Sequence, residues 1–216
     1  MKGPGPMRFV VTAGPTREYL DPVRFLSNPS TGKMGFAVAA AAAKRGHEVV
    51  LVAGPVALPT PRGVSRVDVV SAREMLAAVR AAIDGHPGAV FVSTAAVADW
   101  RPAHRAAKKL KKGEMTGVLR LVRNPDILRT LRRAPIRRVG FAAETGDPVA
   151  EAARKCREKA LEFIVANDVT APGAGFGVDT NRVTFVFPDG RARALPLLSK
   201  RRVAGFVVRE IEGLGT

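Results

Sequence analysis

The sequence predicts an α/β fold, a three-layer sandwich in which a mainly parallel sheet lies between two layers of helices. Two observations support this prediction. Short apolar runs typical of strands alternate along the chain with alanine-rich or amphipathic stretches typical of helices. Strands alternating with helices indicate βαβ units, whose parallel sheet is covered on both faces. The end of the chain departs from this alternation, because residues 182–197 have the turn signals of an antiparallel hairpin.

The expected strands are 8–12, 47–55, 88–96, 137–144 and 163–168. The expected helices are 32–46, 71–85, 124–133, 147–162 and 199–213. Ser30 and Thr31 are candidate N-caps of the first helix, and Ser71 with Glu74 has the spacing of a capping box on the second. With 46% apolar residues the chain can bury a substantial core, so we expect one domain over residues 1–216.

The composition is strongly basic, with 35 Lys and Arg against 19 Asp and Glu and a net charge of +16. Residues 105–138 alone carry 12 basic side chains. Such an excess attracts polyanions, although a solvated arginine-rich surface is an equally good interpretation. The composition argues against a nucleic-acid partner, because the chain has one Trp and one Tyr and so lacks aromatic residues for base stacking.

Two absences indicate a cytoplasmic protein. No apolar run approaches the roughly 18 residues of a membrane span, and the N-terminus has no signal-peptide pattern, so we expect no membrane association. Cys156 is the one cysteine, which excludes an intramolecular disulfide and fits a reducing compartment. Its position in a helical pattern predicts a structural role.

The stretch "RFLSNPSTGKMG" lies in a long loop after the first expected strand. It has the composition of a phosphate-binding loop without the P-loop spacing, because Ser27 and Met34 occupy the positions of the first glycine and the metal-binding hydroxyl. Gly32 at the start of a helix could still receive an anion. Turn and packing roles for these glycines remain an open alternative.

Further polar residues follow the other strands, where ligands of open α/β sheets bind. Asp99 is followed by a basic run that contains Lys108, Lys109, Lys111 and Lys112. These lysines could hold a triphosphate, or they could be solvated. Lys155 and Lys159 share a helix face and could close on one anion or face solvent. The sequence has no zinc-binding pattern and no G-x-S-x-G elbow.

Together these loops resemble one family, phosphopantothenate–cysteine ligase, the phosphopantothenoylcysteine synthetase of coenzyme A biosynthesis. The motifs appear in that family's order over roughly residues 7–212: "VVTAGPTREYLDPVRFLSNPSTGKMGFA", "AAVADWRP", "KKLKK", "VRNPDIL", "VGFAAET", "KALEFIVANDV" and "GFGVDTNRVTF". The resemblance implies a Rossmann-like fold whose C-terminal hairpin region belongs to a dimerisation extension. It also implies a ligase that joins 4′-phosphopantothenate to L-cysteine through an acyl-cytidylate, turning CTP into CMP and pyrophosphate.

The resemblance assigns roles by motif position. Asn28 would hold the acyl intermediate and Lys109 would stabilise nucleotidyl transfer. The residues implied around the nucleotide are Gly14, Ser30, Gly32, Gly35, Asp99, Lys109, Asn124, Pro125, Asp126, Ile127, Phe141, Lys155, Lys159 and Asn167. Those implied around phosphopantothenate are Arg24, Asn28, Ala95, Ala96 and Asp99, with Arg24 reaching across from a neighbouring subunit.

Cofactors and partners follow in the same way. Mg²⁺ would accompany CTP, with metal ligands that the sequence leaves unknown. We expect a stand-alone ligase without the flavin-dependent decarboxylase half that bacterial members commonly carry, and therefore no flavin; a separate decarboxylase is a possible partner. A homodimer is implied, with segments near 105–122 and 170–187 in contact. The alternatives are a Rossmann-like NAD(P)-dependent oxidoreductase, whose ribose-binding acid is missing after residues 47–55, and a basic nucleic-acid-binding module.

Overall fold

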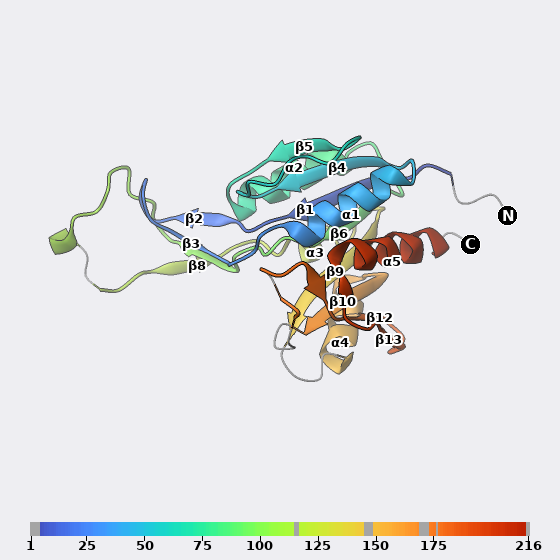
Figure 1. Ribbon diagram of the computed structural model, residues 1–216. Helices are drawn as coiled ribbons and strands as arrows, with labels where there is room; N and C mark the ends of the chain where they lie inside the picture. The colour runs from blue at the N-terminus through green and yellow to red at the C-terminus, as the bar shows by residue number, and fades with distance from the viewer. Residues whose placement is uncertain (1–4, 115–116, 145–148, 169–172, 176, 215–216) are drawn as a thin grey trace.

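The computed structural model describes residues 5–114, 117–144, 149–168, 173–175 and 177–214. An eight-stranded sheet runs through it in the order β13-β12-β10-β9-β6-β1-β4-β5 (Figure 1). The parallel strands are β1 (Arg8–Ala13), β4 (Glu48–Ala53), β5 (Ser65–Asp68), β6 (Val90–Ser93), β9 (Arg137–Glu144) and β10 (Phe163–Asp168). The hairpin of β12 (Val183–Val186) and β13 (Ala192–Ala194) adds to one edge antiparallel, as predicted.

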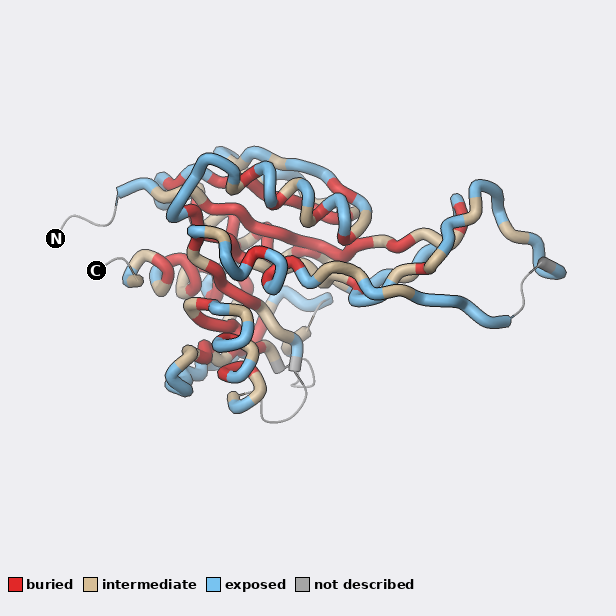
Figure 2. The backbone as a smooth tube through the Cα atoms, turned by 180° about the vertical axis from the view of Figure 1, so that it is seen from behind, coloured by how far each residue is buried: buried red, intermediate tan, exposed pale blue. Residues whose placement is uncertain are grey.

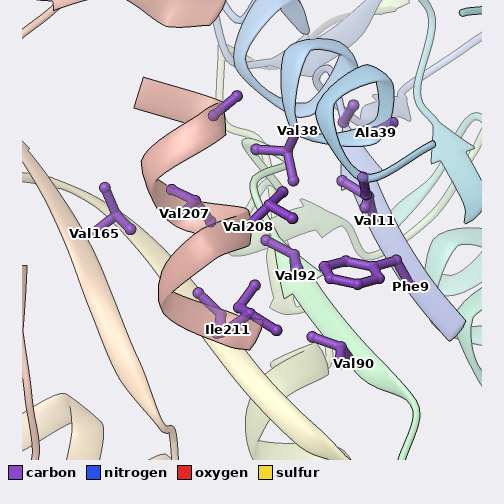
Figure 3. Close-up of a cluster of buried hydrophobic side chains, with 14 of the residues drawn as sticks. Phe9, Val11, Val38, Ala39, Val90, Val92, Val165, Val207, Val208 and Ile211 are labelled. Atoms are coloured by element: carbon purple, nitrogen blue, oxygen red, sulfur yellow. The ribbon is translucent and has the colours of Figure 1, made fainter. Parts of the chain in front are cut away.

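Helices cover both faces of this sheet, which confirms the predicted three-layer α/β fold. α1 (Lys33–Lys44) and α5 (Lys200–Gly213) pack on one face, with the buried side chains of β1, β6 and β10 (Figures 1 and 3). α2 (Ala72–Ile83), α3 (Ile127–Thr130) and α4 (Val149–Lys159) pack on the other. Successive residues of a strand face opposite layers, so Val11 joins the first cluster and Val10 the second.

Helix ends show where sequence patterns were right and where they were wrong. Ser71 caps α2 and accepts a hydrogen bond from the Glu74 N–H at 3.3 Å, as the capping box predicts. Neither Ser30 nor Thr31 caps α1; its N-cap is Gly32, with φ 76° and no side-chain cap. A left-handed N-cap suits glycine, which has no Cβ to clash.

The expected helix 124–133 is reduced to the four residues of α3. It starts later than expected because the Asn124 N–H donates to Asp99 O outside the helix, and Asp126 is the N-cap, accepting from the Arg129 N–H at 3.0 Å. The expected helix 147–162 is α4, and residues 147–148 lie outside the described residues. The closing helix is α5, capped by Ser199.

Short strands that the sequence did not predict build an arm, here defined as residues 17–27, 100–114 and 117–123. In it β2 (Arg17–Tyr19) pairs with β3 (Phe25–Ser27), and β7 (Trp100–Pro102) with β8 (Leu121–Arg123). The arm also carries a short 3₁₀ helix, Lys112–Glu114. It projects from the carboxyl end of the sheet (Figures 1 and 2). A second small pair, β11 (Thr180–Asn181) with β14 (Leu198–Ser199), precedes α5.

Cys156 is fully buried in α4, which fits the structural role predicted for it. Burial raises the pKa of its thiol to about 11. At pH 8 the thiolate is therefore about 100-fold scarcer than for a thiol of pKa 9.0, and burial also blocks access. We expect folded protein to react with a thiol reagent at least ~100-fold more slowly than protein in denaturant. Equal labelling rates in the two states would contradict this placement.

The same shift has a consequence for stability. Folding favours the neutral thiol, so unfolding becomes easier as pH rises above about 9 towards 11.

Among the described residues, no helix is both long and apolar enough to cross a membrane.

Candidate active site

The topology places a crevice beyond the carboxyl ends of β1 and β6. From β1 the chain runs through α1 to β4 and β5 on one side, and then returns to β6 on the other side of β1. Such a switch in direction separates the loops that follow the two strands and opens a binding crevice. Here the loops are also held together, since Ala96 N–H donates to Gly14 O at 2.9 Å and Ala98 N–H donates to Thr16 Oγ1 at 3.0 Å.

The α1 cavity, named for the helix that begins in it, occupies this crevice on the α1 and α5 face. It has a volume of about 430 Å³. Nine of the predicted site residues line it: Asn28, Ser30, Gly32, Gly35, Ala95, Ala96, Asp99, Phe141 and Asn167. The structure therefore gathers residues from four separate sequence motifs around one space.

The glycines of this cavity have packing reasons as well as an anion-binding one. A Cβ on Gly35 would lie 2.5 Å from Ala13 Cβ, so only glycine lets α1 approach β1 this closely. A Cβ on Gly32 would lie 3.3 Å from Gly14 N. Close approach leaves the first N–H groups of α1 at the cavity, where the helix dipole favours an anion. Gly14 itself is not among the residues that line the cavity.

The α3 cavity lies next to it, on the face covered by α2, α3 and α4, and has a volume of about 500 Å³. It is lined by Asn124, Pro125, Asp126, Ile127 and Lys159 among others. Three predicted residues, Ala95, Asp99 and Phe141, line both cavities. One elongated ligand, or two ligands that react, can thus lie across the end of the sheet.

An ion pair closes one side of the α3 cavity. Lys159 Nζ lies 2.8 Å from Asp126 Oδ2. Burial raises the pKa of Asp126, but the hydrogen bonds from Lys159 and from the Arg129 N–H outweigh it, so the pKa lies below its usual value. Asp126 is therefore ionised at neutral pH. Lys155 lines an adjoining basic hollow with Lys159, so the two lysines do share one side of this region.

Asn28 is exposed at the mouth of the α1 cavity. Its Nδ2 donates to Ala96 O at 3.2 Å and to Val97 O at 3.3 Å. These bonds aim a neutral amide at the loop that carries Asp99. Asn124 fixes the other side of the same loop, because its Nδ2 donates to Ala98 O at 2.8 Å and its N–H donates to Asp99 O at 2.8 Å.

Arg24 and Lys109 line neither cavity, and both belong to the residue ranges of the arm. They are nonetheless close to each other, because both flank buried Asp21. Asp21 accepts the N–H of Arg24 at 2.8 Å and the N–H of Leu110, the residue after Lys109, at 3.3 Å. Burial raises the pKa of Asp21, but these backbone hydrogen bonds and that of Val23 outweigh it and lower the pKa.

Several lining residues of the α1 cavity were missed in the sequence. Lys33 follows Gly32, but the failed P-loop spacing gave it no role. Asn181 lies inside a recognised motif without a role of its own, and Lys200 follows the cap of α5 with no chemical signal. Among the described residues, no three His, Cys, Asp or Glu side chains lie close enough together to hold a metal ion.

Comparison with known proteins places these features in a family. The family model for the DNA/pantothenate metabolism flavoprotein C-terminal domain matches residues 6–214 of this chain. The coenzyme A biosynthesis bifunctional protein CoaBC of Vibrio vulnificus is 47% identical over 212 residues, which cover 95% of this chain and 52% of that protein. CoaBC of Bacillus subtilis is 47% identical over 208 residues, 95% of this chain and 51% of that protein.

A solved structure agrees with these sequence matches. The crystal structure of the C-terminal domain of CoaBC superposes with a TM-score of 0.81 at 42% identity, covering 96% of this chain and 95% of that one. The chain thus spans about half the length of the curated relatives that it matches and nearly the whole of that solved domain.

Proposed function

The chain belongs to the DNA/pantothenate metabolism flavoprotein C-terminal domain family, and on this premise we propose that it is a phosphopantothenate–cysteine ligase. The proposed reaction joins 4′-phosphopantothenate and L-cysteine in coenzyme A biosynthesis and uses CTP. The observation that carries the proposal is the pair of adjoining cavities that share Ala95, Asp99 and Phe141. They offer one space for a nucleotide and one for the acid that it activates.

The chemistry requires two steps. A carboxylate is a poor acyl donor, so its oxygen first attacks the α-phosphate of the nucleotide; a P–O bond forms and pyrophosphate leaves. The neutral amine of cysteine then attacks the acyl carbon and loses a proton, the C–O bond to phosphate breaks, and CMP leaves. Hydrogen-bond donors that face the developing charge lower such barriers.

Asn28 suits the second step because its amide is neutral and lies at the mouth of the α1 cavity. Its two bonds to backbone carbonyl groups are long, at 3.2 and 3.3 Å, and the side chain is exposed. Nδ2 can therefore exchange one of them for the acyl oxygen at little cost. The N-terminus of α1, with Ser30, Gly32 and Gly35, offers N–H groups to a phosphate.

On the α3 side, Asn124, Pro125, Asp126 and Ile127 would surround the nucleotide, with Lys155 and Lys159 supplying positive charge. Phe141 and Asn167 complete the proposed nucleotide site. Mg²⁺ prefers one or two carboxylates together with phosphate oxygens, so a single acid such as Asp99 is a sufficient donor set. When bound, the ion would neutralise the charge that develops on the triphosphate.

The arm provides the reason to propose a homodimer. It carries Arg24 and Lys109, the two predicted site residues with roles in the reaction that lie outside both cavities, and it exposes Val23, Trp100 and Leu121. A second copy of the chain would cover this surface and receive Arg24 in its own α1 cavity. The expected subunit contact spans 105–122 and 170–187; residues 115–116, 170–172 and 176 of it lie outside the described residues.

Subunit complementation tests the arm. Arg24→Ala and Asn28→Asp proteins should each be nearly inactive. After mixing and subunit exchange, each mixed dimer would contain one complete site, in which one subunit supplies Asn28 and the other supplies Arg24. About half of the dimers are mixed and half of their sites are whole, so about a quarter of wild-type activity should return. No recovery in verified mixed dimers would contradict a shared site.

The function itself is tested by a stepwise assay. CTP, Mg²⁺ and 4′-phosphopantothenate should release pyrophosphate, and later addition of cysteine should release CMP. No pyrophosphate with either CTP or ATP would refute the ligase. Salt-dependent binding of duplex or single-stranded nucleic acid that CTP leaves unchanged would favour the nucleic-acid-binding alternative instead.

A further inference from the structure

The α5 side of the α1 cavity carries two asparagine side chains, Asn167 of the proposed nucleotide site and Asn181, which has no role in the reaction so far. Asn167 continues the alternation of Phe163 and Val165 on β10, so it faces the α1 and α5 layer. Asn181 lies two residues before Val183, which pairs with Asn167, and it lines the same cavity. Both amides therefore stand on one wall, at the carboxyl end of the sheet.

Both side-chain oxygens are buried without a partner. The Oδ1 atoms of Asn167 and Asn181 accept no hydrogen bond from any described residue, and Asn181 is only 3% exposed. Buried acceptors in folded proteins are nearly always paired. A cavity that leaves two of them open is suited to a ligand that brings its own donors.

Positive charge lies beside these acceptors. Lys200 is 6% exposed, lines the cavity from the first turn of α5, and donates from Nζ to Gly175 O at 2.9 Å. Lys33 lines it from the first turn of α1 and pairs with Asp179 at 2.7 Å. Burial lowers the pKa of Lys200, the charge of Lys33 lowers it further, and Asp179 opposes both. Both lysines thus bring positive charge to this wall of the cavity, which attracts an anion.

The combination restricts the ligand. A triphosphate offers anionic oxygens and no donors, so it would suit the lysines and leave both amide oxygens unpaired. A metal ion would suit the oxygens and be repelled by the lysines. An α-amino acid has a carboxylate and an amino group two bonds apart, and it matches both features at once.

We propose that Lys200 and Asn181 bind the amino-acid co-substrate, with the carboxylate on Lys200 and the amino group donating to the Asn181 oxygen. This inference rests on the proposed ligase function, in which cysteine is the substrate with both groups. The neighbouring Asn167 oxygen can accept from the same amino group or from the nucleotide. Cysteine would thereby enter from the α5 side and present its amine, once neutral, to the acyl group held near Asn28.

Half-reactions separate this role from nucleotide binding. Lys200→Met and Asn181→Leu should raise the KM for cysteine at least tenfold. Pyrophosphate release from CTP and 4′-phosphopantothenate, measured without cysteine, should stay within twofold of wild type. Arg201→Met, which removes an exposed charge from the next position of α5, is the matched control and should change neither value. Equal loss in the cysteine-free step would overturn the assignment.

Cysteamine tests the carboxylate contact directly, because it is cysteine without that group. Wild type should prefer cysteine, and Lys200→Met should lose most of this preference while its rate with cysteamine is unchanged. Equal slowing of the reactions with cysteine and with cysteamine would refute the carboxylate role. Lys200→Arg, which keeps the charge, should restore part of the preference for cysteine. It shows whether the effect of Lys200→Met comes from the lost charge and not from misfolding. If wild type releases no pyrophosphate, the ligase proposal itself has failed.

Discussion

Asn28→Asp is expected to slow amide formation by about 100-fold or more while pyrophosphate release continues, so that acyl-nucleotide accumulates. Asparagine and aspartate have the same shape, but an ionised carboxylate has no N–H to donate to the acyl oxygen. It would also place an oxygen against Ala96 O and Val97 O, where Nδ2 now donates. The measurement is rapid quench followed by chromatography of the acyl-nucleotide, before and after cysteine is added.

The pattern of the defect matters more than its size. A residue that only held the loop would slow both half-reactions together. Lys109→Gln provides the comparison, since loss of that charge should slow the pyrophosphate-releasing step itself. Rapid conversion of acyl-nucleotide to product by the Asn28→Asp enzyme would contradict the role proposed for Asn28.

Gly35→Ala is expected to destabilise the fold by about 1–3 kcal/mol and to weaken ligand binding at the α1 cavity. The added Cβ would lie 2.5 Å from Ala13 Cβ and 3.0 Å from Thr12 O, so α1 must move away from β1. That movement displaces the N-terminus of α1 and with it the anion site. Urea unfolding measures the first effect and calorimetric binding of nucleotide the second.

Gly205→Ala, inside α5, is the matched control. The nearest atom to its added Cβ is the end of Arg209, at 3.7 Å, so nothing needs to move. Alanine should then stabilise α5 by roughly 0.5–1 kcal/mol, as it usually does in helix interiors. If both substitutions changed the free energy of unfolding alike, close packing of α1 on β1 would not be the reason for Gly35.

The parallel layers were predictable because their signals are local. Runs such as residues 8–12 and 163–168 are mostly apolar and continuous, and the capping pattern of Ser71 and Glu74 lies within one turn. The arm was not predictable in the same way. Its strands are three residues long and pair residues such as Trp100 and Arg123 across more than twenty positions of polar, basic chain.

The site residues that lie in local motifs were predictable, and those that depend on distant segments were not. Motifs located Asn28, Asp99 and Asp126, and the structure places them around the two cavities. The roles of Asn181 and Lys200 depend on burial and on neighbours from distant segments, which no local pattern records. Their sequence context, an N-terminal helix position for Lys200 and a loop motif for Asn181, is compatible with ordinary structural roles.

Oxygen transfer tests the central claim most directly. With 4′-phosphopantothenate labelled with ¹⁸O in its carboxylate, attack on the α-phosphate followed by amide formation must move one labelled oxygen into the released CMP. Mass spectrometry of CMP after a complete turnover with cysteine should therefore show one ¹⁸O per molecule. Unlabelled CMP, or label found in inorganic phosphate or pyrophosphate, would contradict an acyl-cytidylate intermediate.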